Sequence, residues 1–440
     1  MADANLMEKI VSLAKRRGFV YPGSEIYGGL AGTFDYGPMG VLLKENIQNL
    51  WLRMFRDERD DMYSVDAAIL MNPKVWESSG HVAGFSDPLV ECEKCKKRFR
   101  ADHLDDVKTC ECGGKLGEAR QFNMMFKTHA GAMEDESAVV YLRPETAGGM
   151  FVNYKNVIDS IHPKLPFGLI QIGKAFRNEI APRDFIFRLR ELSQMEVEYF
   201  VNPSDWERAF EEWRKTIHAY AAAIGLSEGT VHELEVPDGD RAHYSKRTID
   251  FEFDYPFGRK ELWGLAYRTD FDLSAHEKGS GVEQKYLDEE AKEKFTPHVI
   301  EPSLGVDRTI LALLSSAYRE DEMGGEMRTY LAFDPKVAPV KAMVAPLLKN
   351  KPELVAKARE VRAELRKVHP QIAWDDNGNI GKRYRRQDEI GTPFCVTIDF
   401  DTLGEKPELK DTVTLRHRDT GEQERLSVAA AAARIAAAVA

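Results

Sequence analysis

The sequence has few cysteines and no long apolar run. Only five of the 440 residues are Cys, which excludes the disulfide framework of a small secreted domain. No apolar stretch approaches the roughly 18–20 residues of a membrane span. The first ten residues, MADANLMEKI, contain no apolar signal core. We therefore expect a cytoplasmic protein without a membrane partner.

The sequence also lacks basic charge and the common glycine motifs for phosphate. Its 61 Lys and Arg residues face 72 Asp and Glu residues, which leaves a net charge of −11. An acidic balance counts against a nucleic-acid partner, because phosphate binding usually coincides with net basic charge. The P-loop pattern and the Rossmann glycine fingerprint are both absent. A nucleotide site in this chain must therefore hold phosphates in another way.

The length is sufficient for two or three domains. Up to about residue 325, short β-like runs are frequent, at 167–172, 195–200 and 248–253, and a helical stretch covers 203–224. Strands outnumber crossover helices here. This pattern predicts an α+β domain at 1–325, in which helices flank a large antiparallel sheet.

Beyond residue 325 the pattern changes to alternating strands and helices, which is typical of a separate α/β domain at 326–440. We expect its strands at 340–345, 372–374, 393–399 and 412–418, and its helices at 351–369 and 380–390. No internal repeat is present.

Four of the five cysteines form two close pairs: Cys92, Cys95, Cys110 and Cys112. Four thiols in this spacing suit tetrahedral Zn²⁺, and four protein ligands leave no open position, so a structural zinc is expected. The zinc-binding insertion would cover about 88–120, with His103 as an alternative ligand. The other interpretation is a set of unrelated surface thiols. Cys395 lies far away in an expected strand and is interpreted as a buried free thiol.

Two arginines stand at the ends of expected elements. Arg177 follows the apolar strand 167–172, and Arg308 begins the apolar helical run 309–317. A guanidinium presents a planar fork that matches phosphate oxygens, so the two could hold different phosphates of one nucleotide. Solvated ion pairs are the alternative for each arginine taken alone.

Longer motifs surround these arginines. FRNE with RLREL and QMEVEYF resembles motif 2 of the class II aminoacyl-tRNA synthetases, and EPSLGVDR resembles motif 3. The stretch YGPMGVLLKENIQNLWLRMF, running on to DAAILMNP, resembles motif 1. RPETAGGMFVNY, ELWGLAYRTDFDL and RYRRQDEIGTPFCVTIDFD resemble signatures of the homodimeric glycyl-tRNA synthetases. The resemblance covers nearly the whole chain, in the expected order.

The resemblance implies a reaction in which glycine attacks ATP to form glycyl-adenylate, which then acylates the 3′ end of tRNA(Gly). It also implies the residues that bind ATP: Arg177, Asn178, Glu179, Phe187, Leu192, Glu261, Leu262, Gly305, Asp307 and Arg308. Three of them are the implied catalytic residues. Arg177 would contact the α-phosphate, Arg308 the γ-phosphate, and Glu261 would help to hold Mg²⁺. Neither step needs a protein nucleophile, because positioning and charge neutralisation lower the barrier.

Glycine has no side chain, so its selection must come from the exclusion of anything larger, which makes an editing site unnecessary. Its ammonium group needs carboxylates. By resemblance, the glycine-binding residues are Arg100, Glu145, Gln194, Glu196, Arg268, Glu301 and Ser303.

Two residues depart from the family pattern. Leu192 stands where a Phe usually stacks on adenine, so Phe185 or Phe187 could replace that ring. Gly148 stands where the family usually has Gln. Both departures concern the fine structure of the site rather than the fold.

The second domain resembles the class IIa anticodon-binding domain. Around Tyr384 it carries the expected anticodon-binding residues Lys382, Arg383, Arg385, Arg386, Asp388 and Glu389. Cations around an aromatic ring suit phosphates and unpaired bases. A solvated helix face is the other interpretation. This local basic cluster would allow an acidic chain to bind tRNA, because a partner responds to the local field rather than to the net charge.

The resemblance also implies a homodimer formed through motif 1. Two other functions stay open at this point. One is a non-catalytic paralogue that binds RNA or regulates, although the arginines and carboxylates of the motifs are intact. The other is a class IIa synthetase for another small amino acid, which the three carboxylates and the EPS stretch disfavour.

Overall fold

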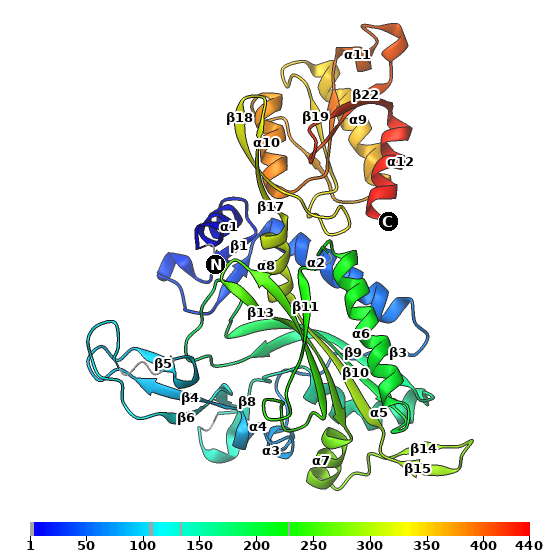
Figure 1. Ribbon diagram of the computed structural model, residues 1–440. Helices are drawn as coiled ribbons and strands as arrows, with labels where there is room; N and C mark the ends of the chain where they lie inside the picture. Colours follow the sequence, from blue (N-terminus) through cyan, green and yellow to red (C-terminus); the bar gives the residue numbers. More distant parts are fainter. Residues whose placement is uncertain (1–3, 105–108, 133, 228) are drawn as a thin grey trace.

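A seven-stranded sheet forms the centre of the larger domain in the computed structural model, which describes residues 4–104, 109–132, 134–227 and 229–440 (Figure 1). The strands, in their order across the sheet, are β11 (Val231–Glu235), β12 (Arg247–Tyr255), β13 (Gly258–Thr269), β16 (His298–Gly305), β10 (Glu191–Val201), β9 (Phe167–Phe176) and β3 (Met62–Ser64). All neighbours pair antiparallel except β3 and β9. The predicted antiparallel sheet is confirmed.

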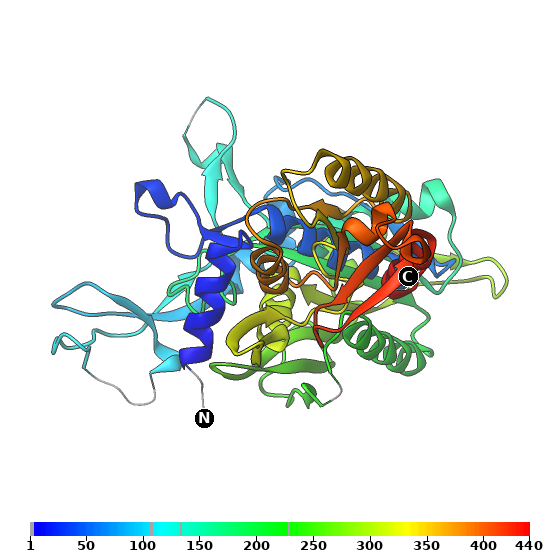
Figure 2. The ribbon, with the colours of Figure 1, turned by 90° about the horizontal axis from the view of Figure 1, so that it is seen from above.

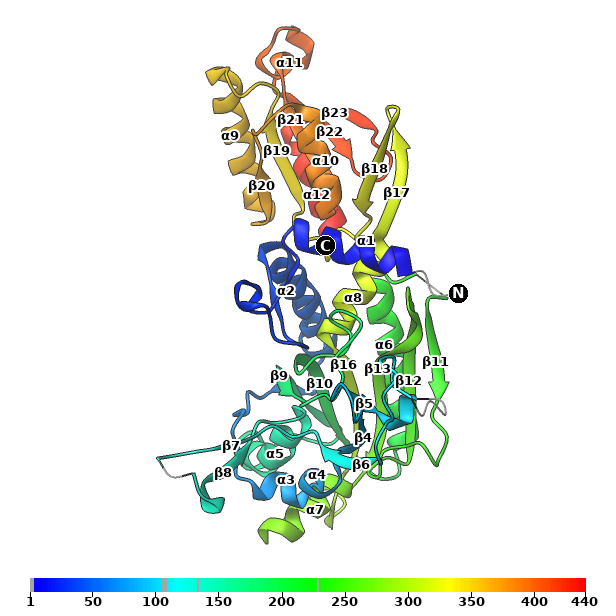
Figure 3. The same ribbon diagram turned by 90° about the vertical axis from the view of Figure 1, so that its left-hand side faces the viewer.

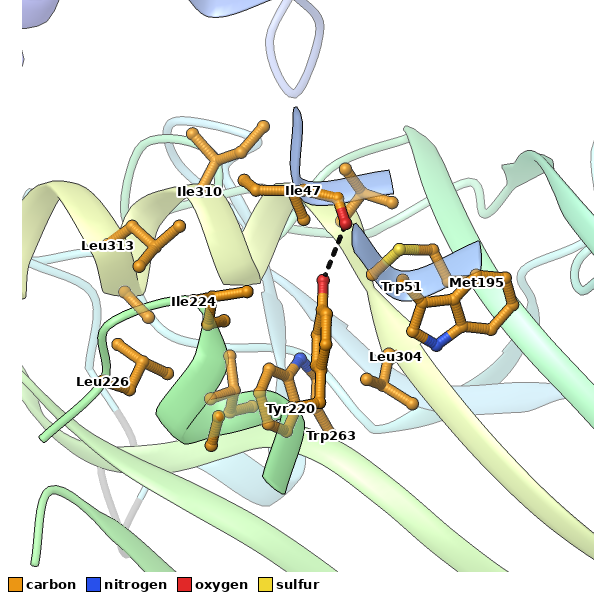
Figure 4. Close-up of a cluster of buried hydrophobic side chains, with 14 of the residues drawn as sticks. Ile47, Trp51, Met195, Tyr220, Ile224, Leu226, Trp263, Leu304, Ile310 and Leu313 are labelled. Carbon is orange, nitrogen blue, oxygen red and sulfur yellow. Dashed lines mark hydrogen bonds between the residues drawn. The ribbon is translucent and has the colours of Figure 1, made fainter. Parts of the chain in front are cut away.

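Three long helices bury one face of this sheet. They are α2 (Pro38–Leu52), α6 (Trp206–Ala223) and α8 (Val306–Ala317). In Figure 4, side chains of α2, α6 and α8 meet Trp263 and Leu304 of the sheet, and the Tyr220 hydroxyl donates to the Ile47 carbonyl oxygen over 3.1 Å. Helix α6 forms because Trp213, Ile217 and Tyr220 recur at helical spacing and produce one apolar face.

A second, smaller core lies on the other face of the sheet. Successive side chains of a strand point to opposite faces, so Tyr199 of β10 joins the first core while Phe200 joins the second. Helices α5 (Ala147–Ile161) and α7 (Phe271–Ser280) contribute Phe151 and Leu273 to this second core. Glu196 and Glu198 share the face of Phe200.

A small three-stranded sheet forms the insertion that projects from the large domain (Figure 1). It consists of β5 (Arg98–Arg100), β4 (Ser86–Glu91) and β6 (Arg120–Asn123). The other short elements before the second domain are β1 (Val20–Pro22), η1 (Glu25–Tyr27), β2 (Phe34–Tyr36), η2 (Arg53–Asp57), α3 (Lys74–Ser78), α4 (His81–Gly84), η3 (Ala101–His103), β7 (Lys127–His129), η4 (Glu136–Ala138), β8 (Val139–Tyr141), β14 (Tyr286–Asp288) and β15 (Glu293–Phe295).

The second domain has the predicted α/β character, and its sheet is mixed and five-stranded, with one strand, Gln423–Ser427, beyond the four that the sequence predicted. Its strands, in order, are β20 (Ile372–Trp374), β19 (Ala342–Pro346), β21 (Phe394–Ile398), β22 (Thr412–His417) and β23 (Gln423–Ser427). Its remaining elements are α9 (Pro352–Val368), α10 (Ile380–Ile390), α11 (Phe400–Leu403), η5 (Pro407–Leu409) and α12 (Val428–Val439). Helices α9 and α12 share one apolar core, and Tyr384 of α10 packs on the other face. Among all described residues, no helix has the length and apolar character to cross a membrane.

The two domains meet at α1 (Ala4–Arg16) and at the hairpin of β17 (Tyr318–Met323) and β18 (Glu326–Leu331). The hairpin lies against α10, and α1 lies beside both at the junction (Figures 2 and 3). Glu389 of α10 forms ion pairs with Arg16, at 3.2 Å, and with Arg17. These contacts tie the first helix of the chain to the second domain.

Candidate functional site

Two adjoining pockets open at the ends of the central strands. The first, called the arginine pocket, is lined by Arg177, Glu179, Ile186, Phe187, Arg188, Leu189, Leu192, Ser193, Gln194, Glu261, Leu262, Ser303, Gly305, Asp307 and Arg308. It contains every residue that the resemblance assigned to ATP except Asn178. Arg177 follows β9 directly and Arg308 stands in the first turn of α8, so two distant segments bring their guanidinium groups to one cavity.

Arg308 is held in a fixed orientation. Its guanidinium lies 4.5 Å from the centre of the Phe187 ring and 3.1 Å from the Glu261 carboxylate. Burial would raise the pKa of Glu261, but Arg308 lowers it below its usual value. The carboxylate therefore stays ionised beside the arginine. Tyr255 and Phe257 hold the Phe187 ring edge-on, each at 5.2 Å between ring centres.

Several polar atoms in this pocket make no hydrogen bond within the described part of the chain, although Glu179 Oε2 lies 3.5 Å from Nη1 of Arg188. The Oε2 atom of Glu179 and the Oε1 atom of Gln194 are buried without a hydrogen bond. Buried acceptors of this kind normally find a donor, since an unsatisfied group is costly. The two atoms therefore mark positions where a ligand can donate hydrogen bonds.

The departures from the family pattern have a structural setting. Leu192 lines the arginine pocket, and so does Phe187. Phe185 packs instead against Phe34, with 5.1 Å between ring centres, so of the two candidate rings only Phe187 lines the cavity. At Gly148, an added Cβ would lie 2.8 Å from the Trp76 ring. The Trp76 side chain thus occupies the space that a longer residue at this position would need.

The second pocket, called the carboxylate pocket, is lined by Glu145, Arg177, Gln194, Glu196, Val236, Asp240, Arg241, Ala242, Tyr244, Thr248, Asp250, Glu261, Gly264, Leu265, Ala266, Glu301 and Ser303. Four residues, Arg177, Gln194, Glu261 and Ser303, line both pockets. A ligand in one pocket can therefore react with a ligand in the other.

Three carboxylates face this second pocket, and those of Glu196 and Glu301 are buried. Glu196 accepts hydrogen bonds from Ser303 Oγ at 2.6 Å and Gln194 Nε2 at 3.2 Å, and Glu301 pairs with Arg268 at 2.5 Å. Glu145 lies 3.4 Å from His81 Nε2. Because all three line one pocket, they form a single cluster of mixed charge with Arg268 and His81.

The carboxylates of this cluster are not fully neutralised by the neighbouring cationic side chains. Burial raises the pKa of Glu301 to about 8, although Arg268 opposes the shift. Burial also raises the pKa of Glu196, and the negative charge of Glu145 adds to that shift. Burial would also raise the pKa of Glu145, but His81 brings it down to about 2. A small ammonium group would relieve the mutual repulsion of these carboxylates. The pocket therefore favours a compact cation.

Some expected residues lie outside the two pockets. Asn178 uses its backbone N–H to donate to Met124 O over 2.7 Å. Arg100 pairs with Asp87 at 2.5 Å and with Asp102 at 2.6 Å. Arg268 is buried behind the carboxylate pocket, where Asp272 accepts from it twice at 2.8 Å. It acts on the pocket through Glu301.

Sequence reasoning missed His81, Tyr244 and Asp250. His81 orients Glu145, and Tyr244 and Asp250 line the carboxylate pocket. Burial and the nearby Glu261 raise the pKa of Asp250 to about 7. Tyr244 and Asp250 belong to YSKRTIDFEF, which ends at Phe253, shortly before the quoted ELWG stretch of the neighbouring strand begins at Glu261. That proximity is the signal that could have found them.

The four paired cysteines converge, as a metal site requires. The sulfurs of Cys92, Cys95, Cys110 and Cys112 all lie within 4.8 Å of one another. Backbone N–H groups, that of Cys95 first, lower the pKa of Cys92 to about 6, which favours the thiolate. An added Cβ at Gly114 would lie 2.7 Å from the Cys92 sulfur, so glycine leaves room for the sulfurs. The cluster fits Zn²⁺ with four thiolate ligands. The side chain of His103 lies outside the described residues.

The basic cluster of α10 divides into surface and interior residues. Lys382 is exposed, Arg385 and Arg386 are partly exposed, and Arg386 pairs with Asp375 at 2.8 Å. Arg383 is buried and donates to backbone oxygens, including that of Gly378 at 2.7 Å.

Asp388 is also fully buried, between Arg416 at 2.8 Å and Arg328 at 3.5 Å. Two of the expected anticodon-binding residues, Arg383 and Asp388, therefore stabilise the interior of the domain. The accessible face of the helix is formed by Lys382, Arg385 and Arg386.

Both parts of the chain match known protein families. Residues 126–317 match the family model described as the tRNA synthetase class II core domain (G, H, P, S and T), and residues 341–438 match the anticodon binding domain. These matches agree with the predicted fold class.

Curated relatives match over nearly their whole length. Glycine–tRNA ligase from Lachnospira eligens is 50% identical, with 96% of each chain covered. The Thermobifida fusca enzyme of that name is 48% identical over 97% of this chain and 96% of its own. The enzyme of that name from Treponema denticola is 47% identical over 96% of this chain and 94% of its own.

Proposed function

The chain belongs to the glycine–tRNA ligases, a family of class II aminoacyl-tRNA synthetases, and we propose that it ligates glycine to tRNA(Gly) in two steps. The carboxylate of glycine first attacks the α-phosphorus of ATP, which releases pyrophosphate and forms glycyl-adenylate. A terminal hydroxyl of the tRNA then attacks the glycyl carbonyl and releases AMP. The observation that carries this proposal is the close similarity to the curated relatives over 96% of the chain. As a translation enzyme, the protein would act in the cytoplasm.

The arginine pocket is the proposed ATP site. Arg177 borders both pockets, so its guanidinium can neutralise the charge that grows on the α-phosphate. Arg308, fixed by Phe187 and Glu261, would hold the γ-phosphate. The Oε2 atom of Glu179, which makes no hydrogen bond within the described residues and lies 3.5 Å from Arg188, would accept from the adenine amino group. Leu192 and Phe187 would cover the base.

The carboxylate pocket is the proposed glycine site. Glu145, Glu196 and Glu301 would bind the ammonium group, and Ser303 keeps Glu196 in place through its hydrogen bond. The carboxylate of glycine would then point to Arg177, where the two pockets meet. This placement brings the nucleophile and the α-phosphate together without any protein nucleophile.

The site residues also fit the Mg²⁺ that ATP carries. Asp250 and Glu261 line the same pocket, and burial together with the charge of Glu261 raises the pKa of Asp250 to about 7. Carboxylate oxygens are the ligands that Mg²⁺ prefers. Glu261, with Asp250 beside it, would hold the ion, which when bound neutralises phosphate charge. The Zn²⁺ expected at the four cysteines would be structural, because all four positions are filled by protein.

Residues 326–440 are proposed to hold the anticodon, with Lys382, Arg385 and Arg386 as the accessible contacts. Residues 1–325 would carry the chemistry, with the zinc-binding insertion at about 88–120.

The protein is also proposed to form a homodimer through motif 1. The segment around it exposes apolar side chains, namely Val41 of α2 (40% exposed), Ile69 (37%) and Leu70 (51%). Sedimentation of the wild type and of Leu70→Asp tests this. A dimer that becomes a monomer supports the interface, and a wild-type monomer contradicts it.

Pyrophosphate exchange with separate amino acids tests the function. The enzyme should exchange pyrophosphate into ATP with glycine but not with alanine, serine or proline. It should then charge tRNA with glycine. Exchange that prefers another amino acid would point to a different class IIa synthetase, and absence of any exchange would point to a non-catalytic paralogue.

A further inference from the structure

Part of the carboxylate pocket has no role in the proposed reaction. If glycine binds as proposed, its ammonium group faces Glu145, Glu196 and Glu301, and its carboxylate faces Arg177. The remaining walls are β13, where Gly264 has no side chain, β12 with Thr248 and Asp250, and the loop of residues 236–246, called the roof loop, that connects β11 with β12. The hydrogens on the α-carbon of glycine therefore face the roof loop and Gly264.

The roof loop is braced along its length. The Val236 N–H donates to Thr248 O at 2.9 Å and closes the base of the loop. The Arg241 side chain spans the loop, because its Nε donates to Val236 O at 2.9 Å and its Nη1 donates to Lys246 O. The Lys246 N–H donates to Tyr267 O of β13 at 2.9 Å. The loop therefore forms a fixed wall of the pocket.

Tyr244 is the largest side chain that the roof loop contributes to the pocket. Its ring centre lies 3.7 Å from the guanidinium carbon of Arg268, and Arg268 in turn pairs with Glu301 at 2.5 Å. From α7, the Phe271 ring lies 6.4 Å from Tyr244 and 5.1 Å from the neighbouring His243. The phenol ring is thus held over the Arg268–Glu301 pair from two sides.

We propose that Tyr244 is a specificity-determining residue that excludes amino acids larger than glycine. Its ring would occupy the space into which a methyl or hydroxymethyl group on the α-carbon would project. The ring cannot move aside without losing its contacts with Arg268 and Phe271, so an added methyl group meets steric overlap. This inference rests on the proposed function and assigns the exclusion step to one side chain.

Exchange assays with size variants test the inference. The full-length enzyme is compared as wild type, Tyr244→Phe, Tyr244→Leu and Tyr244→Ala, with glycine, alanine and serine. We expect the wild type and Tyr244→Phe to use glycine alone, since both keep the ring. Tyr244→Ala should raise the ratio of kcat/KM for alanine over glycine at least about tenfold, with Tyr244→Leu in between.

Tyr330→Ala is the matched control, because the Tyr330 ring also lies on a buried guanidinium, 4.1 Å from Arg328, but borders neither pocket. This control variant should leave the ratio of kcat/KM for alanine over glycine unchanged. A ratio that stays at the wild-type value in the Leu and Ala variants would overturn the inference, whatever happens to glycine activity. If circular dichroism shows that the Ala variant does not fold, the Leu variant decides by the same ratio. A wild-type enzyme without glycine-dependent exchange would instead refute the proposed function.

Discussion

Replacement of Asp388 by Asn should destabilise the second domain strongly. The Asp388 carboxylate accepts from both terminal nitrogens of Arg416, at 2.8 and 3.0 Å, and lies 3.5 Å from Arg328. The substitution preserves the shape of the side chain but leaves Arg416 buried without a countercharge. Loss of one partner in a buried pair costs about 3–5 kcal/mol. Because Arg328 keeps its second partner Asp321, we expect about 3 kcal/mol.

This loss is large enough to see by calorimetry. At roughly 2.1 cal/mol/K of unfolding entropy per residue, 1 kcal/mol lowers Tm of a domain of this size by about 4 °C, so the transition of the second domain should fall by about 12 °C. Charging of tRNA should fall with it. Lys382→Ala, which changes an exposed residue of the same helix, should leave Tm unchanged.

One result would refute this reasoning. If Asp388→Asn retains the wild-type Tm but weakens tRNA charging, the carboxylate contacts the tRNA and does not stabilise the interior. The substitution would then support the anticodon-binding role that the family resemblance implies for Asp388.

Four further predictions concern the two pockets, the basic helix and the metal site. Arg177→Ala should lower glycine-dependent pyrophosphate exchange at least about a hundredfold, and retained exchange would contradict its role at the α-phosphate. Arg385→Ala should weaken tRNA charging while exchange stays near normal, whereas equal loss of both would reject the division between the domains. In Gly264→Ala the new Cβ meets no atom within 4 Å, so the fold should persist while the methyl group raises KM for glycine about tenfold; an unchanged KM speaks against this. Gly114→Ala should lower the zinc content measured by mass spectrometry, because its Cβ would crowd the Cys92 sulfur, and full zinc content would argue otherwise.

The fold was predictable where local signals are strong. Helix 380–390 and strand 372–374 occur at the expected residues, because apolar periodicity and neighbouring Gly and Pro residues mark their ends. Helix α6 begins at Trp206 rather than at 203, since the first residues of the expected helix form a turn. Element boundaries depend on capping details that a pattern shows only coarsely.

The site was only partly predictable for a different reason. The motif residues Arg177 and Arg308 could be named, but their stacking and pairing partners lie in other segments. Asp388 was expected to contact anticodon bases because it follows the basic cluster of the motif, whereas the arginines that bury it lie 60 and 28 residues away. Tyr244 carries no motif of its own. Its position follows from tertiary contact with Arg268, which sequence spacing does not show.

The position of β16 determines when the site can form during synthesis. This strand is the last of the seven in the chain, yet it lies between β13 and β10 in the middle of the sheet. It carries Glu301 and Ser303, and Arg308 follows it. A ribosome-bound chain that ends before β16 has two incomplete sheet halves with unpaired inner edges. Assembly of the sheet and completion of the pockets therefore coincide in one late event, after more than two thirds of the chain has been made.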